Sequence, residues 1–404
     1  MTFSSEPTRA LERLKVLAAG IISLILMLGI ARFAYTPLLP LMQQQASLGI
    51  SEGGWLASIN YMGYFTGVLI AASISNMMLK DRLYRIGIIV AVVSTLGMAL
   101  TTNFWVWSLM RYLAGLSSAA SILLGSGLIL NWLIRHRYRS ELGIHFAGAG
   151  LGIAFCSYVS SIMTPEFDWR EQWLALSLIG VLMAIPAWRW LPKPENSHVM
   201  KNGEALVDNP PSKAYLRLFI AAYLCAGVGF VISATFIVAI VNQQNPLSDE
   251  GTLVFMVLGL AAAPSCIIWD LVARKTGDLN ALALAFAIHT TGIVLPVFSN
   301  GSATAYLSAV LFGGTFMGIV SLVLTMAGRL YPSAPSKMMG KMTISYGVAQ
   351  IVAPAITGQI AEAGGGYSDG LTMAGLFMVV GTLLVLSLRV VEQREHANQQ
   401  LNQV

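Results

Sequence analysis

Apolar windows of about 20 residues or more recur along the whole of this 404-residue chain, separated by short polar turns. As a helix, a window of this length crosses the hydrocarbon core of a bilayer and bonds every backbone polar group within its own segment. The sequence therefore predicts an all-α membrane protein with twelve transmembrane helices. Their approximate limits are 16–43, 53–79, 86–104, 105–134, 143–164, 171–191, 215–243, 252–273, 279–299, 303–329, 338–361 and 371–391.

The composition excludes a soluble globular protein. Charged residues make up only 11% of the chain and hydrophobic residues 56%, whereas soluble domains carry about 25% charged residues. The cysteines, Cys156, Cys225 and Cys266, all lie inside apolar windows, where a free thiol behaves as a small hydrophobic group. We therefore expect neither a disulfide framework nor a metal site, and no cofactor.

The basic residues are distributed unevenly between the predicted connections. With the N-terminus inside, the termini and the even-numbered connections hold nearly all of the 24 Lys and Arg residues, whereas the outer connections hold Arg170 and several acids. The positive-inside rule then makes both termini cytoplasmic, in a multi-pass protein of the bacterial cytoplasmic (inner) membrane. The break between the third and fourth windows, at 101–104, is weak, so the count of twelve rests partly on this charge pattern. The pattern also explains the net charge of +5 without a nucleic-acid partner.

The longest polar segment divides the chain into two similar halves. It predicts an N-terminal six-helix bundle over 1–191, a cytoplasmic linker over 192–214 and a C-terminal six-helix bundle over 215–404. Asp81 and Arg85 follow the second window, and Asp270 and Arg274 follow the eighth, with the same spacing of four in each pair. Duplicated halves are typical of secondary transporters.

Motifs near the second, fourth and fifth windows point to a known family. KDRLYRIG keeps Asp81, Arg82 and Arg85 of a D-R-x-G-R pattern but has Tyr84 in place of glycine, RYLAGLSSAAS carries R-x-x-x-G, and GIHFAGAGLG is glycine-rich but lacks a Gly-Pro pair. These segments resemble signatures of the major facilitator superfamily. The segments RFAYTPLLPLM, NYMGYFTG, DWREQW, YLCAGVGFVISATF and GGTFMGIVSL are similar to its YbfB/YjiJ-like branch. The resemblance implies two pseudo-symmetric six-helix bundles around a mid-membrane site, with the first and fourth helices as neighbours.

Two arginines lie deep inside predicted spans. Arg32 is seventeen residues into the first window, and Arg111 lies at a comparable depth in the fourth. A guanidinium stays charged, so each must face the protein interior, a water-filled cavity or a partner group. No Asp or Glu lies well inside any window. Either an anionic substrate neutralises these arginines, which we favour, or carbonyls, aromatic rings and water hold them.

Other polar and aromatic residues in the windows are candidates for the transport pathway. His289 and His145, together with Arg111, are candidates for proton coupling, although a histidine hydrogen-bonded between helices is the commoner case. Asp81, Arg85, Asp270 and Arg274 are predicted to form an inner gate in the outward-facing state. The predicted substrate-binding residues are Arg32, Tyr35, Asn60, Tyr64, Arg111, Tyr223, Phe230, Thr315, Phe316, Tyr346 and Gln350.

The sequence thus predicts a secondary active transporter that moves a small organic solute, anionic or amphipathic, by alternating access and is driven by the proton gradient. Its expected partners are the small-molecule substrate and the lipid bilayer, and we expect a monomer. Multidrug efflux is the first alternative, since the C-terminal half is apolar, and a transporter-like receptor or sensor is the second. An enzyme is not expected, because the windows contain no set of acid, base and nucleophile.

Overall fold

The computed structural model describes residues 6–74, 76–136, 142–194, 211–244, 250–299, 301–330 and 335–401. Helices account for nearly all of these residues, and no strand occurs among them. Three short segments, labelled η, are π-helices. In chain order the elements are α1 (Glu6–Leu24), η1 (Ile25–Phe33), α2 (Tyr35–Gln45), α3 (Ile50–Ser73), α4 (Met77–Ala99), α5 (Phe104–Ala119), η2 (Ala120–Gly125), α6 (Ser126–Arg135), α7 (Leu142–Met163), α8 (Trp169–Arg189), α9 (Lys213–Gln244), α10 (Gly251–Ala262), α11 (Ser265–Thr276), α12 (Asp278–Phe298), α13 (Ser302–Leu330), α14 (Pro335–Ile360), η3 (Ala361–Gly365) and α15 (Gly366–Leu401).

Each predicted window coincides with a helix or with a continuous run of helices. Among the described residues, 10 helices are long and apolar enough to cross a membrane, and the pair α10 and α11, bent by 45°, brings the number to 11. The helix at the remaining window, α14, is 26 residues long but carries more polar side chains. The predicted all-α membrane fold is confirmed, and α14 occupies the position of the predicted eleventh span.

One predicted boundary is wrong. The second window was expected to extend to residue 79, followed by a loop, but α3 ends at Ser73 and α4 begins at Met77. The side chain of Asn76 accepts hydrogen bonds from the backbone N–H groups of Met78 and Leu79, so it caps α4 at this point. Asp81 and Arg85 therefore lie on a helix and not in a loop.

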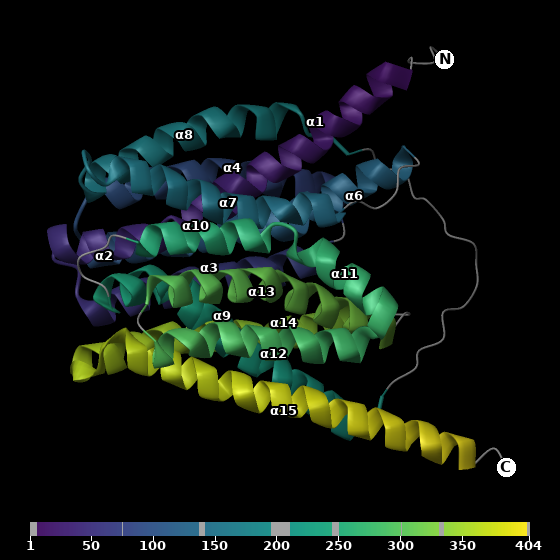
Figure 1. Ribbon diagram of the computed structural model, residues 1–404. Coiled ribbons are helices and arrows are strands. Elements are labelled where there is room, and N and C mark those ends of the chain that lie inside the picture. Colours follow the sequence, from purple (N-terminus) through teal and green to yellow (C-terminus); the bar gives the residue numbers. More distant parts are fainter. Residues whose placement is uncertain are drawn as a thin grey trace.

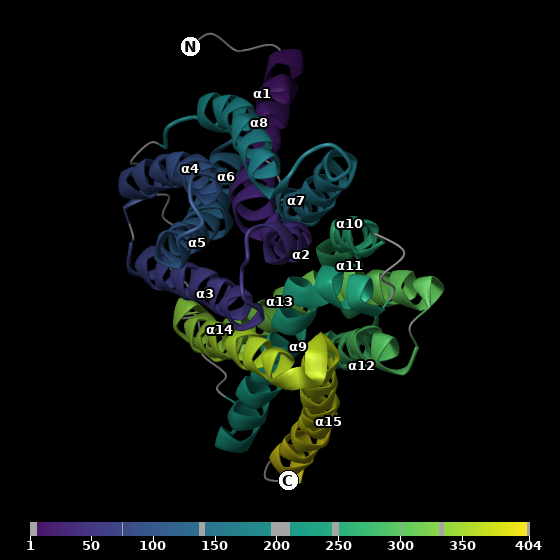
Figure 2. The same cartoon turned by 90° about the vertical axis from the view of Figure 1, so that its left-hand side faces the viewer.

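The helices form two groups that lie side by side. Figure 2 shows α1–α8 in one group and α9–α15 in the other. Across the boundary, α3 packs against α14, α7 against α10, and α2 against α9. Figure 1 shows that α1 begins and α15 ends on the same side of the molecule. We call this the terminal side; the sequence predicts that it is cytoplasmic. The other end is the opposite side.

Candidate functional site

A cavity of about 1160 Å³ lies between the two helix groups. Its walls come from η1, α3, η2, α6 and α7 on one side and from α9, α11, α13 and α14 on the other, and most of its lining side chains are apolar. Asp270, Arg274 and Arg329 line its mouth at the terminal side. Its deep end is lined by Arg32, Phe33, Tyr64, Tyr223, Phe230, Phe316, Tyr346 and Gln350.

Arg32 brings the positive charge at the deep end. It lies on η1 and is 5% exposed, and its guanidinium carbon lies 4.4 Å from the ring centre of Tyr61 and 4.5 Å from that of Tyr64. Its Nε has no hydrogen-bond partner, and no carboxylate of the described residues pairs with it. The two rings offer a cation–π interaction, but they accept no hydrogen bond in the plane of the guanidinium. Arg32 therefore retains unused donor capacity where it borders the cavity.

Arg111 on α5 has a different environment. Its Nη1 donates to the carbonyls of Ala31 and Arg32, both at 3.2 Å, and its guanidinium lies 4.3 Å from the ring centre of Tyr35. Those carbonyls belong to η1, where i to i+5 bonding, as from the N–H of Ala34 to Gly29, replaces the α-helical ladder. Arg111 thus ties α5 to the first helix and does not line the cavity.

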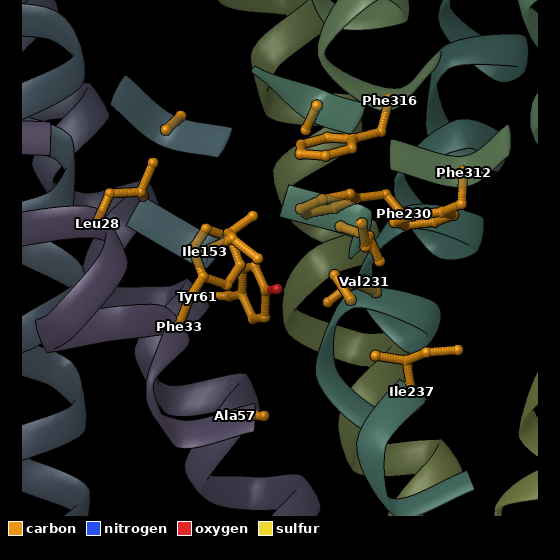
Figure 3. Close-up of a cluster of buried hydrophobic side chains, with 14 of the residues drawn as sticks. Leu28, Phe33, Ala57, Tyr61, Ile153, Phe230, Val231, Ile237, Phe312 and Phe316 are labelled. Atoms are coloured by element: carbon orange, nitrogen blue, oxygen red, sulfur yellow. The ribbon is translucent and has the colours of Figure 1, made fainter. Parts of the chain in front are cut away.

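The C-terminal group presents aromatic rings to the deep end. Tyr223 stacks on Tyr346 at 4.5 Å, and Phe230 stacks on Phe316 at 5.1 Å and on Tyr346 at 5.9 Å. Phe312 stacks behind Phe230 and Phe316. Figure 3 shows Phe230, Phe312 and Phe316 facing Tyr61, Phe33 and Ile153 across the boundary between the groups. We call Tyr223, Phe230, Phe312, Phe316 and Tyr346 the aromatic column.

Contacts between the two groups close the molecule on the opposite side. Thr36 on α2 donates to the carbonyl of Ala234 on α9 at 3.0 Å, and Gln43 on α2 donates to the hydroxyl of Tyr367 on α15 at 2.7 Å. A Cβ atom added to Gly54 would lie 2.6 Å from the carbonyl oxygen of Pro354 and 3.0 Å from the Cα of Gly358. The cavity is therefore closed on the opposite side and extends toward the terminal side.

The predicted gating residues lie at the terminal side, but no ion pair among them joins the two groups. Asp81 is buried and pairs with Arg85 at 3.0 Å, and Arg85 also donates to the carbonyls of Trp188 and Leu191, so this pair fixes α4 to the end of α8. Asp270 and Arg274 pair with each other at 2.8 Å on α11, exposed at the mouth.

Neither histidine predicted to couple protons lines the cavity. The Nδ1 of His289 lies 2.7 Å from the hydroxyl of Thr315, and its ring stacks at 4.7 Å on Phe312, behind the aromatic column. His145 is fully buried close to Gly20, and neither of its ring nitrogens has a hydrogen-bond partner.

Some of the residues predicted to bind substrate line the cavity, and others do not. Arg32, Tyr64, Tyr223, Phe230, Phe316, Tyr346 and Gln350 line it. The remaining four pack between helices: Tyr35 donates to the carbonyl of Gly53, Asn60 donates to that of Arg111, Thr315 bonds to His289, and Arg111 bonds to η1.

Sequence reasoning missed several residues that surround Arg32. Tyr61 lies beneath the Arg32 guanidinium, and Phe33, Phe65 and Ile153 line the cavity. The spacing of three residues between Tyr61 and Tyr64 is a signal that could have identified Tyr61. The others are apolar residues within largely apolar windows, so nothing in the sequence distinguishes them from residues that face lipid or pack between helices. Among the described residues, no group of three or more His, Cys, Asp or Glu side chains is placed to hold a metal ion.

Comparisons with known proteins agree with this architecture. The "Probable sugar efflux transporter" of Helicobacter pylori (strain ATCC 700392 / 26695) is 26% identical over 305 residues, which cover 72% of each chain. The "Hexuronate transporter" of Bacillus subtilis (strain 168) is 21% identical, over 86% of this chain and 88% of that protein. The crystal structure of a mutant of the nucleoside transporter NupG superposes with a TM-score of 0.74 at 12% identity, over 94% of this chain and 99% of that one. An inward-facing, occupied bacterial homologue of the lysosomal transporter Spinster superposes with a TM-score of 0.70 at 14% identity, over 96% and 98%. These two structures establish the fold alone.

A family model described as "Uncharacterised MFS-type transporter YbfB" matches residues 24–386, which is most of the chain. The resemblance to this branch is thereby confirmed. The chain is a multi-pass membrane protein that belongs to the YbfB family of transporters in the major facilitator superfamily.

Proposed function

We propose that this protein is a proton-coupled secondary transporter that moves a small organic anion across the bacterial inner membrane by alternating access. Its termini are cytoplasmic in this proposal, so the structure corresponds to the inward-facing state. The observation that carries the proposal is the cavity, which is closed on the opposite side and has an unpaired arginine at its deep end. Outward opening would require that the α2–α9 and α2–α15 contacts break and that the mouth closes.

The charge of the solute follows from the surroundings of Arg32. A buried guanidinium without a carboxylate partner binds an anion by charge-assisted hydrogen bonds, and Arg is suited to carboxylate because its donors lie in one plane. Arg111 does not compete for that anion, since backbone carbonyls and Tyr35 hold it. The name "Hexuronate transporter" of one relative is consistent with an anionic solute, because a hexuronate carries a carboxylate.

Proton coupling needs a titratable group near the solute, and the described spans contain no carboxylate at the depth of Arg32. His289 is the candidate that we propose, because one ring, Phe312, separates it from the rings that line the cavity. His145 is further away, packed against α1, and Arg111 stays charged.

Multidrug efflux is the second candidate, and the apolar lining favours it. An efflux pump for cations would place its substrates beside Arg32, where like charges repel strongly in a medium of low dielectric. We therefore expect any exported compounds to be neutral or acidic.

Uptake into proteoliposomes tests the proposal. We expect a pH gradient to drive accumulation of organic acids, and Arg32→Gln to raise the half-saturation concentration about 10- to 100-fold, because a charge-assisted hydrogen bond contributes about 1.5–3 kcal/mol. Arg189→Gln is the matched control, since this arginine lies exposed at the end of α8 and does not line the cavity. Equal uptake of organic acids by the wild type and Arg32→Gln would remove Arg32 from solute recognition.

A further inference from the structure

We infer that the solute is a flat ring bearing a single carboxylate, with the ring stacked on the aromatic column and the carboxylate bound to Arg32. This inference rests on the proposed transport of an organic anion and specifies its chemical class.

The rings of the aromatic column stack on one another. The planes of the stacked pairs are inclined by 28° for Tyr223 and Tyr346, 30° for Phe230 and Phe316, and 29° for Phe230 and Tyr346. Aromatic pairs favour such offset stacking. A flat aromatic solute can stack on these side chains in the same way, whereas a puckered saturated ring has no π-face with which to stack.

The deep end of the cavity offers a single positive charge. Arg32 is the only cation that lines the deep end within the described part of the chain. The other cations that line the cavity, Arg274 and Arg329, are at the mouth and already pair with Asp270 and Asp278, at 2.8 and 2.5 Å. One free cation neutralises one carboxylate. A second negative charge on the solute would be buried without a partner, at a large cost in free energy.

The deep end of the cavity also offers few hydrogen-bonding groups. Besides Arg32, the deep end offers the hydroxyls of Tyr64, Tyr223 and Tyr346 and the amide of Gln350, among aromatic and aliphatic side chains. A sugar acid has hydroxyl groups around its whole ring, and each one that is buried without a partner weakens binding. A ring with apolar faces therefore suits the column, and Arg32, which lines the same cavity, is the cation available to its carboxylate.

Binding of small probes to the purified protein, measured by calorimetry, tests this inference. Benzoate is the aromatic monocarboxylate, and it is compared with benzamide, which lacks the charge, cyclohexanecarboxylate, which lacks the flat ring, phthalate, which has a second carboxylate, and galacturonate. We expect benzoate to bind at least tenfold more tightly than each of the other four. Arg32→Gln should weaken benzoate and cyclohexanecarboxylate alike.

Variants of the column separate stacking from general packing. We expect Phe230→Leu and Phe316→Leu each to weaken benzoate about three- to tenfold while changing cyclohexanecarboxylate less than twofold. Phe298→Leu is the control, because Phe298 is 84% exposed on the outside of the helix bundle. The melting temperature of each variant reports whether it folds.

Two further outcomes distinguish this inference from the proposed function. If galacturonate or cyclohexanecarboxylate binds as tightly as benzoate and depends on Arg32, the flat-ring class is wrong and transport of an organic anion stands. If Arg32→Gln changes neither the binding of any acid nor its uptake, both are wrong.

Discussion

Among single residues, the two intramembrane arginines, Arg32 and Arg111, are both buried charges, but their contacts differ. Both bring a permanent charge into an apolar segment. Arg111 bonds to two carbonyls of the π-helix η1 and lies over the ring of Tyr35, whereas Arg32 lies against two tyrosine rings at the edge of a cavity. The difference decides which arginine can bind a solute.

Arg111→Met tests whether Arg111 stabilises the fold. The substitution leaves the carbonyls of Ala31 and Arg32 without their partner inside the protein, and we expect a loss of about 1–3 kcal/mol of stability. Removing a buried charge offsets part of this loss. Thermal unfolding in detergent, with Arg274→Met as the exposed control, measures the difference. A melting temperature that equals or exceeds that of the wild type would show that the cost of burying the charge outweighs the hydrogen bonds.

The sequence could identify Arg32 but not distinguish its environment from that of Arg111. A charge within an apolar window is visible without a structure, and so is the absence of a buried carboxylate. The π-helix whose carbonyls accept from Arg111 is not visible, because nothing in ILMLGIARF signals i to i+5 bonding. Asn60, an expected cavity residue, instead donates to the backbone carbonyl of Arg111 on α5, a contact between segments far apart in the chain that the sequence does not reveal.

At the scale of the element, glycines set how closely the two groups approach. Gly54 on α3 and Gly358 on α14 bring backbone against backbone at the opposite side, and Gly150 on α7 does the same with Gly259 on α10. No side chain fits between these helices at these points. The sequence shows many glycines, and only the packing reveals which of them lie between the two groups.

Gly54→Ala is a sharp test of this closure. Alanine is the better helix former by about 1 kcal/mol, so α3 itself is not weakened. Its Cβ would nevertheless press on the backbone of α14, and overpacking of this kind costs about 1–3 kcal/mol. We expect the variant to disfavour the state closed on the opposite side by roughly 5- to 150-fold and to slow uptake.

Gly314→Ala on α13 is the matched control, since no heavy atom lies within 4 Å of the position of its added Cβ. If Gly54→Ala transports like the wild type and like this control, the closed contact is not part of the transport cycle.

For the whole molecule, the fold could be predicted from the sequence because the bilayer constrains the length of each span and the charge of each connection. Window length, charge asymmetry and the Asp81 and Asp270 repeat required no tertiary information. The side on which the cavity is closed could not be predicted from the sequence. It depends on hydrogen bonds such as those of Thr36 with Ala234 and of Gln43 with Tyr367, whose partners are far apart in the chain.

The central claim is that the cavity is reached in turn from both sides of the membrane. Labelling of Gln350→Cys by a membrane-impermeant maleimide tests it most directly, in a background without Cys156, Cys225 and Cys266, because Gln350 lies at the deep end. We expect labelling from the terminal side for the otherwise unchanged protein, and labelling from the opposite side as well once Gly54→Ala is added. Labelling from the terminal side alone, in both proteins and during uptake, would contradict alternating access and indicate a one-sided receptor.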